Sequence, residues 1–181
     1  EADPEANATD LLIDRVAATP NSALFSLPTA NGGWSDVTSS EFLTQVKDLA
    51  KGLVAAGIEP GDKIGLMCKT RYEWTLIDFA TWFAGAVLVP IYETSSPMIT
   101  ETPDHFARFD EIHADVPAIS NVWQIDLGDL DKLAKSGSDV SDDEIERRRN
   151  LAKGSDLATL IYTSGTTGKP KGCIITHSNF V

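Results

Sequence analysis

The stretch from residue 63 to residue 91 constrains the fold more than any other part of this chain. A short apolar run at 63–68 is followed by a helix-forming segment at 71–83 and by a second apolar run at 86–91. A connection of this length between two strands accommodates a crossover helix, so the strands are predicted to be parallel. In a chain of 181 residues, this unit predicts an α/β fold with a parallel or mixed sheet and flanking helices.

Simpler elements are predicted before this unit. Residues 1–8 are polar and acidic and are expected to be a disordered lead-in. Thr9 or Asp10 is suited to cap a first helix, which ends before Pro20. Two short strands at 23–27 and 34–37 flank a glycine-containing turn, which predicts a hairpin.

Two residue pairs have the spacing of a capping box, in which each side chain binds the other residue's backbone N–H. Thr38 with Glu41 begins a helix with one apolar stripe, and Ser141 with Glu144 begins a polar helix. The polar helix ends in three arginines at 147–149, which could be taken for a phosphate or nucleic-acid patch. Because acidic residues precede them, they are predicted to be a solvated helix face.

The middle of the chain has weaker patterns. Residues 95–103 are predicted to be turn-like, 104–113 helical and 121–126 extended. Cys68 and Cys173 each fall in an apolar run and are predicted to be small buried hydrophobes without a disulfide, as in a reducing compartment.

The charge of the chain restricts its partners. With 27 acidic and 15 basic side chains, the net charge is −12. Such a surface repels nucleic acids and anionic lipids, so no nucleic acid and at most a peripheral membrane association are expected. The longest apolar stretch is short and interrupted by Gly85 and Pro90, so it does not predict a membrane span. A cytoplasmic location follows from these expectations.

A glycine-rich loop at 162–172 is the segment whose residues indicate a chemical function. It lies between apolar runs at 156–162 and 173–176, so a strand–loop–strand arrangement is predicted. Glycines can present consecutive N–H groups to an anion, and the hydroxyls and two lysines of the loop add donors. The loop is not a Walker A motif, because Lys169 is followed by Pro170. Composition alone leaves open a plain hairpin loop without a ligand.

The loop reads Y-T-S-G-T-T-G-K-P-K-G and resembles the signature of the adenylate-forming (AMP-binding) superfamily, which includes acyl-CoA synthetases, luciferases and peptide-synthetase adenylation domains. The segments G-I-E-P-G-D-K-I-G-L-M at 57–67 and G-A-V-L-V-P-I-Y-E-T-S-S at 85–96 are also similar to acyl-CoA synthetases. With W-Q-I-D at 123–126, the chain looks most like bacterial long-chain fatty acid–CoA ligases.

The resemblance implies ATP-dependent activation of a long-chain fatty acid to acyl-AMP, followed by thioester formation with coenzyme A. ATP, Mg²⁺ and coenzyme A would be required. Residues that would bind the ATP phosphates are Thr163, Ser164, Gly165, Thr166, Thr167, Gly168, Lys169 and Lys171, with Thr163 also reaching the metal. His177 is expected to have a capping or packing role rather than a catalytic one. A fatty acyl-AMP ligase or an aryl acid ligase remains an alternative.

Two departures from the family pattern affect the expected activity. The chain stops at Val181, before the family's acidic metal ligand, ribose-binding aspartate and C-terminal domain. Residues 1–181 are therefore expected to be an incomplete N-terminal AMP-binding domain without a catalytic residue, inactive alone or a silent fragment. Between Ser96 and Thr100 the chain is shorter than the family pattern, which places a helix there, so apolar sheet surface is expected to be exposed.

Overall fold

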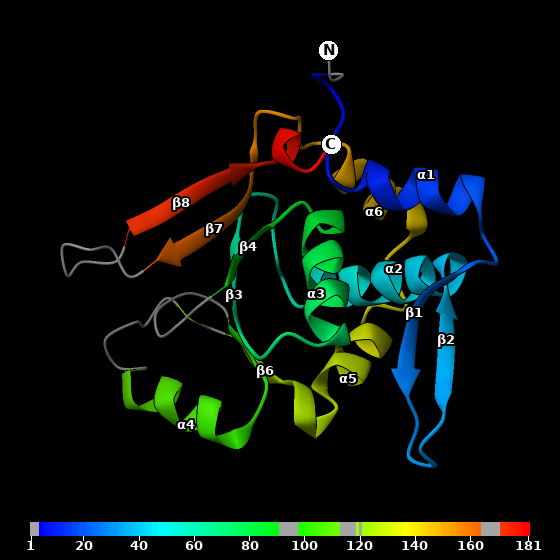
Figure 1. Ribbon diagram of the computed structural model, residues 1–181. Coiled ribbons are helices and arrows are strands. Elements are labelled where there is room, and N and C mark those ends of the chain that lie inside the picture. Colours follow the sequence, from blue (N-terminus) through cyan, green and yellow to red (C-terminus); the bar gives the residue numbers. More distant parts are fainter. Residues whose placement is uncertain (1–3, 91–97, 113–118, 120, 164–170) are drawn as a thin grey trace.

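The computed structural model of this chain describes residues 4–90, 98–112, 119, 121–163 and 171–181. A six-stranded sheet with the order β6-β5-β3-β4-β7-β8 forms its centre (Figure 1). The first five strands in this order are parallel to their neighbours, and only β8 is antiparallel to β7. The strands are β3 (Lys63–Met67), β4 (Val87–Pro90), β5 (Met98–Thr100), β6 (Val122–Gln124), β7 (Leu157–Thr163) and β8 (Lys171–Thr176). The predicted α/β fold is confirmed.

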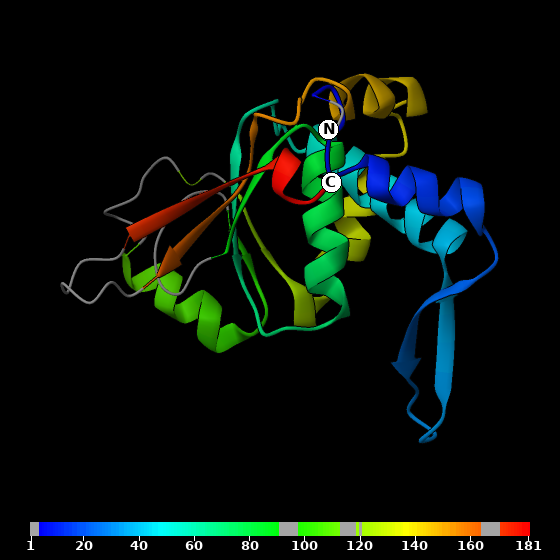
Figure 2. The ribbon, with the colours of Figure 1, turned by 45° about the horizontal axis from the view of Figure 1, so that its top comes forward.

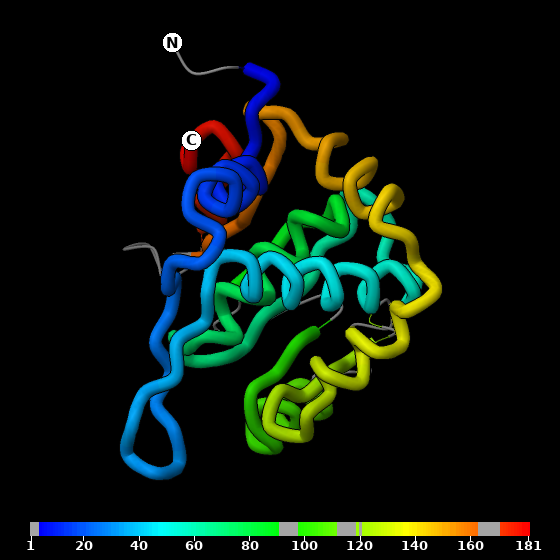
Figure 3. The backbone as a smooth tube through the Cα atoms, turned by 90° about the vertical axis from the view of Figure 1, so that its right-hand side faces the viewer, coloured from blue at the N-terminus to red at the C-terminus, as the bar shows by residue number. Residues whose placement is uncertain are grey.

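Helices cover both faces of this sheet. The views in Figures 1 and 2 place α2 (Ser39–Ala55) and α3 (Tyr72–Phe83) on one side and α4 (Pro103–Ile112) on the other. Three more helices pack around α2 and α3 (Figure 3), namely α1 (Asp10–Ala18), α5 (Asp129–Ser136) and α6 (Asp142–Arg149). The crossover from β3 through α3 to the parallel strand β4 confirms the predicted strand–helix–strand unit.

Successive residues of the central strands contribute to two separate apolar clusters. Leu88 belongs to the cluster beneath α2 and α3, whereas Val89 belongs to the cluster that contains Phe109 of α4. In β5, Ile99 and Met98 divide in the same way. Because side chains alternate between the faces of a strand, a sheet covered on both faces needs a continuous apolar run in each strand.

Two local predictions near the N-terminus are confirmed. Strands β1 (Ala23–Pro28) and β2 (Trp34–Thr38) form an antiparallel hairpin that projects from the helical layer (Figure 2). Thr38 begins α2 with a full capping box: its hydroxyl accepts the Glu41 N–H at 3.2 Å, and its own N–H donates to the Glu41 carboxylate at 2.8 Å.

Close contact between α2 and α5 depends on a glycine. A side chain at Gly52 would collide with the backbone carbonyl of Leu133. Helix α5 begins at Asp129, directly after a 3₁₀ turn at Ile125–Leu127, and was not predicted. Its short polar sequence has too few apolar positions to signal a helix on its own.

Two sequence predictions are corrected by burial or pairing. The described part of the expected disordered lead-in includes Asn7 and Ala8, which are buried. The Asn7 amide donates to the carbonyls of Arg149 and Ala152, and this fixes the segment against the end of α6. Within the expected turn at 95–103, β5 is a strand between β3 and β6, although its three residues carry no periodic pattern.

The connection from β4 to β5 is short. Residues 91–97 lie outside the described residues, and seven residues are fewer than the dozen or more usual for a parallel crossover. This agrees with the expectation that the chain is shortened near Ser96. The expected exposure of the sheet is not found at three described core positions, because Met67, Val89 and Met98 are buried.

The arginines of α6 are not one solvated face as predicted. Only Arg147 has an exposed side chain, at 55%. The Arg148 side chain is 7% exposed and donates to the Ile58 carbonyl and to Glu144, each at 2.7 Å. Arg149, at 12%, pairs with Asp10 of α1 at 3.0 Å. Ser141 accepts the Glu144 N–H as predicted, but the Glu144 carboxylate pairs with Arg147 and Arg148.

We expect Arg148→Met to lower the free energy of unfolding by about 2 kcal/mol, because it leaves the buried Ile58 carbonyl without its donor. Arg147→Met is the matched control on the same helix and should change stability by less than about 0.5 kcal/mol. Urea unfolding of both variants measures the difference. Equal effects of the two substitutions would contradict the structural role assigned to Arg148.

Candidate functional site

The candidate site is carried by the β7–β8 hairpin. Tyr162 pairs with Gly172 and Thr163 pairs with Lys171, which confirms the predicted strand–loop–strand arrangement. The predicted phosphate ligands from Ser164 to Lys169 lie outside the described residues. The two that are described, Thr163 and Lys171, pair with each other at the loop end of the hairpin, and Lys171 is exposed. The metal role of Thr163 remains a prediction.

The loop end of the hairpin lies at the carboxyl edge of the parallel strands. The crossover from β3 leads to β4 on one side, whereas the chain returns from β4 to β5 on the other side of β3. Ligands of open α/β sheets bind outside the carboxyl ends of the strands at such a reversal of strand order. Because β7 pairs directly with β4, the carboxyl end of β7 lies beside this point.

The hairpin is fixed to the sheet by buried polar contacts. Thr159 of β7 is the register partner of Leu88 in β4. The Thr159 hydroxyl donates to the Leu88 carbonyl at 2.8 Å. One residue earlier in β7, the Ala158 carbonyl accepts the indole N–H of Trp82 at 2.9 Å. Trp82 is 5% exposed and comes from α3. Sequence analysis missed this contact, because 76 residues separate its two partners.

His177 lies at the other end of the hairpin, where β8 ends. It is 2% exposed, its Nδ1 accepts the Ala8 N–H at 3.2 Å, and its ring lies 6.0 Å from that of Trp82. Burial lowers the pKa of the imidazole below its usual value of 6.5, which favours the neutral ring. These contacts fit the packing role expected for His177.

His177 is the first residue of a 3₁₀ turn at His177–Asn179. Thr176 is the N-cap of this turn, and its N–H donates to the Asn179 side chain at 2.9 Å. Cys173 in β8 is exposed, in contrast to the prediction of a buried residue. Strand β8 is one of the two edge strands of the sheet, and several of its residues face solvent.

An ion cluster ties together the carboxyl ends of three parallel strands. Arg71 pairs with Glu73 at 2.6 Å, with Glu101 at 3.3 Å and with Asp126 at 3.2 Å. A hydrogen bond from the Lys69 N–H is the main cause of the lowered pKa of Glu101. With three carboxylates on one guanidinium, the cluster has no spare positive charge for a phosphate. Its role is to fix the segments that follow β3, β5 and β6.

Cys68 lies in the same region and is not an activated nucleophile. Burial and the nearby Glu101 raise the pKa of its thiol to about 12, so it is protonated at neutral pH. Within the described ranges, no group of three or more histidine, cysteine, aspartate or glutamate side chains could hold a metal ion. No helix among those ranges is long and apolar enough to cross a membrane.

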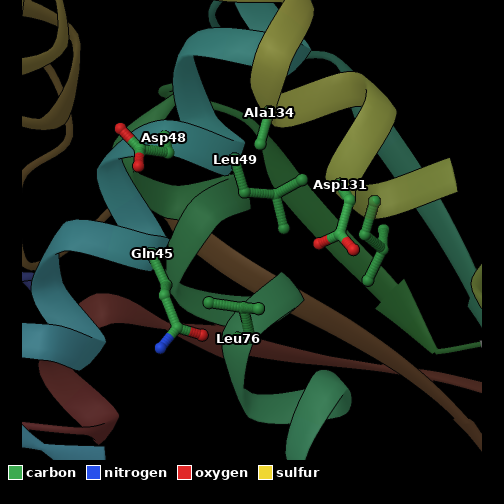
Figure 4. Close-up of a pocket in the computed structure, with 7 residues that line it drawn as sticks. Gln45, Asp48, Leu49, Leu76, Asp131 and Ala134 are labelled. Atoms are coloured by element: carbon green, nitrogen blue, oxygen red, sulfur yellow. The ribbon is translucent and has the colours of Figure 1, made fainter. Parts of the chain in front are cut away.

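A small cavity between α2, α3 and α5 is not part of this site. It has a volume of about 150 Å³, and Leu49, Leu76 and Leu130 line it together with the polar Gln45 and Asp131 (Figure 4). Ligand pockets for drug-sized molecules usually measure about 300–1,000 Å³. The cavity is therefore too small for a nucleotide, and its lining includes no residue of β7 or β8.

The sequence of this chain matches a known protein family over most of its length. The family described as "AMP-binding enzyme" matches residues 13–181, which is nearly the whole chain. This chain belongs to the AMP-binding enzyme family. The family resemblance inferred from the loop and its upstream segments is thereby confirmed.

The relatives of this AMP-binding chain include mycobacterial fatty acid ligases. It is 41% identical to the long-chain-fatty-acid–CoA ligase FadD15 of Mycobacterium bovis and 40% identical to that of Mycobacterium tuberculosis, each match covering 83% of this chain and 28% of the relative. The chain thus spans less than a third of the length of these relatives. The FadD1 ligase structure from Archaeoglobus fulgidus shares the fold, with a TM-score of 0.73, 18% identity and coverage of 99% of this chain and 38% of that one.

The match to FadD15 also bears on the length of this chain relative to its family. The identity is counted over 168 positions, which is more than 83% of 181 residues can supply. The relative therefore has residues for which this AMP-binding chain has no counterpart. This agrees with a chain shortened relative to the family.

We expect Trp82→Phe to loosen the hairpin, because it removes the donor to the Ala158 carbonyl while keeping an aromatic ring. Amides of β7 should exchange with solvent roughly 5- to 10-fold faster, as a lost hydrogen bond of about 1 kcal/mol implies. Trp34→Phe is the control, because Trp34 is 72% exposed on β2. Unchanged exchange in β7 would show that the indole contact does not hold the hairpin.

Proposed function

We propose that the protein to which this chain belongs activates a long-chain fatty acid with ATP, forming acyl-AMP, and then transfers the acyl group to coenzyme A. The observation that carries the proposal is the signature hairpin, placed at the carboxyl edge of the sheet in a chain about 40% identical to long-chain ligases. Both steps redistribute negative charge at a phosphate, so donors aimed at its oxygens would assist them.

The proposed phosphate contacts come from the loop between β7 and β8. Its glycine N–H groups and hydroxyls, with Lys169 and Lys171, would hold the β- and γ-phosphates of ATP, and Thr163 would reach a Mg²⁺ ion. The position of Lys171 supports this role, because its side chain is exposed at the loop end of the hairpin. The chain as a whole has a net charge of −12. A local positive charge is needed there to attract a polyanion against the global field.

We propose further that this chain is inactive by itself. It spans only 28% of the length of its FadD15 relatives. ATP, fatty acid and coenzyme A are the proposed partners, in the cytoplasm, where ATP and coenzyme A are available. Activation of another carboxylic acid, as by a fatty acyl-AMP ligase or an aryl acid ligase, is the competing proposal.

Exchange of labelled pyrophosphate into ATP tests the first step in a protein of full family length that contains this sequence. We expect exchange with long-chain fatty acids, and thioester only when coenzyme A is added. Exchange with aryl acids alone would favour an aryl acid ligase, and acyl-AMP without thioester would favour a fatty acyl-AMP ligase. Absence of exchange with every carboxylate would refute the proposal.

In the same protein, Lys171→Ala should lower the exchange rate roughly 10-fold or more, because a charge-assisted contact to phosphate is lost. Lys153→Ala is the matched control, since Lys153 pairs with Glu5 at 3.1 Å, away from the loop end of the hairpin. A Lys171→Ala rate equal to that of Lys153→Ala would remove Lys171 from the site.

A further inference from the structure

A second cavity lies at the amino ends of the parallel strands, at the opposite edge of the sheet from the signature loop. Its volume is about 410 Å³, within the range of small-molecule sites. The first residues of three strands, Lys63 of β3, Val87 of β4 and Leu157 of β7, are part of its lining. His177 and Asp156, at the base of the β7–β8 hairpin, also line it.

His177 offers this cavity an unused donor. Its Nδ1 accepts the Ala8 N–H, so in the neutral ring Nε2 carries the proton. Among the residues that the structure describes, Nε2 has no hydrogen-bond partner, although the side chain is 2% exposed. Nε2 is not one of the fully buried unpaired atoms of the described residues, so this donor is open to a molecule in the cavity, which would supply an acceptor.

Two charged groups accompany this donor. Asp156 is held next to His177, because its carbonyl accepts the His177 N–H at 3.0 Å. One Asp156 carboxylate oxygen accepts the Lys153 N–H at 2.9 Å, and the other has no partner among the described residues. Lys63 donates one of its three ammonium protons to the Gly61 carbonyl at 3.1 Å and is otherwise unpaired within the described part of the chain.

The charged groups of the lining come from opposite sides of β4. Strand β4 separates β3 from β7, so Lys63 and Leu157 are about 10 Å apart at a strand spacing of about 4.8 Å. Between them the wall is formed by apolar residues, including Val87, Leu157 and the ring of Trp82. The lining therefore has a cation on the β3 side, apolar residues, and one free donor with one free acceptor on the β7 side.

We propose that this cavity binds a small hydroxylated aromatic carboxylate. The carboxylate pairs with the Lys63 ammonium, and the ring lies against Val87 and Leu157. On the β7 side, the hydroxyl of the ligand accepts a hydrogen bond from His177 Nε2–H and donates one to the Asp156 carboxylate. A hydroxyl satisfies both groups at once, whereas a second carboxylate on that side would be repelled by Asp156, and an amine on the other side would be repelled by Lys63.

Calorimetric titration of this chain with 4-hydroxyphenylacetate tests the proposal. We expect saturable binding with one site per chain. Phenylacetate lacks the hydroxyl and should bind at least roughly fivefold more weakly, because two polar groups are left unpaired. Tyramine places an ammonium where the carboxylate should be and should bind at least roughly tenfold more weakly. Lack of saturable binding, or equal affinity for tyramine, would overturn the proposal.

Variants assign the binding to this cavity. Lys63→Met keeps the aliphatic stem and should weaken 4-hydroxyphenylacetate binding roughly fivefold. Lys153→Met removes an exposed lysine that does not line the cavity and should leave the affinity unchanged. The ¹⁵N resonance of His177 Nε2 should shift on binding in the unsubstituted chain. Equal affinities of the two variants, or an unshifted Nε2 resonance, would contradict the assignment.

Discussion

The β7–β8 hairpin is joined to the rest of the sheet along one side only, and this attachment is the constraint on which the site depends. Thr159 pairs with β4, and the indole of Trp82 binds the Ala158 carbonyl from the helix that crosses over between β3 and β4. The same helix therefore makes the sheet parallel and fixes the hairpin. At the base of the hairpin, His177 adds contacts to Ala8 and Trp82, so the N-terminal segment also contributes to its position.

This arrangement bears on the proposal that an acidic chain carries a phosphate-binding loop. The ion cluster at the ends of β3, β5 and β6 has no spare positive charge, since Arg71 contacts three carboxylates. In the proposed site, attraction of ATP therefore depends on the loop itself, with its N–H groups, hydroxyls and lysines. The carboxyl end of β7, from which this loop begins, lies beside the reversal of strand order, where open α/β sheets bind ligands.

The parts of the fold that follow from local signals were predictable. The capping box of Thr38 and Glu41, the first hairpin and the strand–helix–strand unit each depend on residues close together in the sequence. Strand β5 and helix α5 were not predictable, because their pairing partners decide their structure. Burial of Arg148 was missed for the same reason: its acceptor at Ile58 is 90 residues away.

The candidate site divides in the same way. The loop motif and the two strands that flank it could be read from the sequence, and the hairpin between Thr163 and Lys171 confirms them. The contacts that hold this hairpin could not, because Trp82, Ala8 and His177 come together only in the folded chain. The second cavity also depends on residues from three strands and a turn, none of which forms a sequence motif.

The central proposal is that this chain contacts the phosphates of ATP, through the loop between β7 and β8, and does not contact the nucleoside. Calorimetric titration of the chain with Mg·ATP and, separately, with Mg·triphosphate tests it most directly. The account predicts that both ligands bind with the same affinity, within about threefold, and more weakly than about 1 mM, because the nucleoside makes no contact. Submillimolar binding of Mg·ATP, at least tenfold tighter than that of Mg·triphosphate, would contradict it.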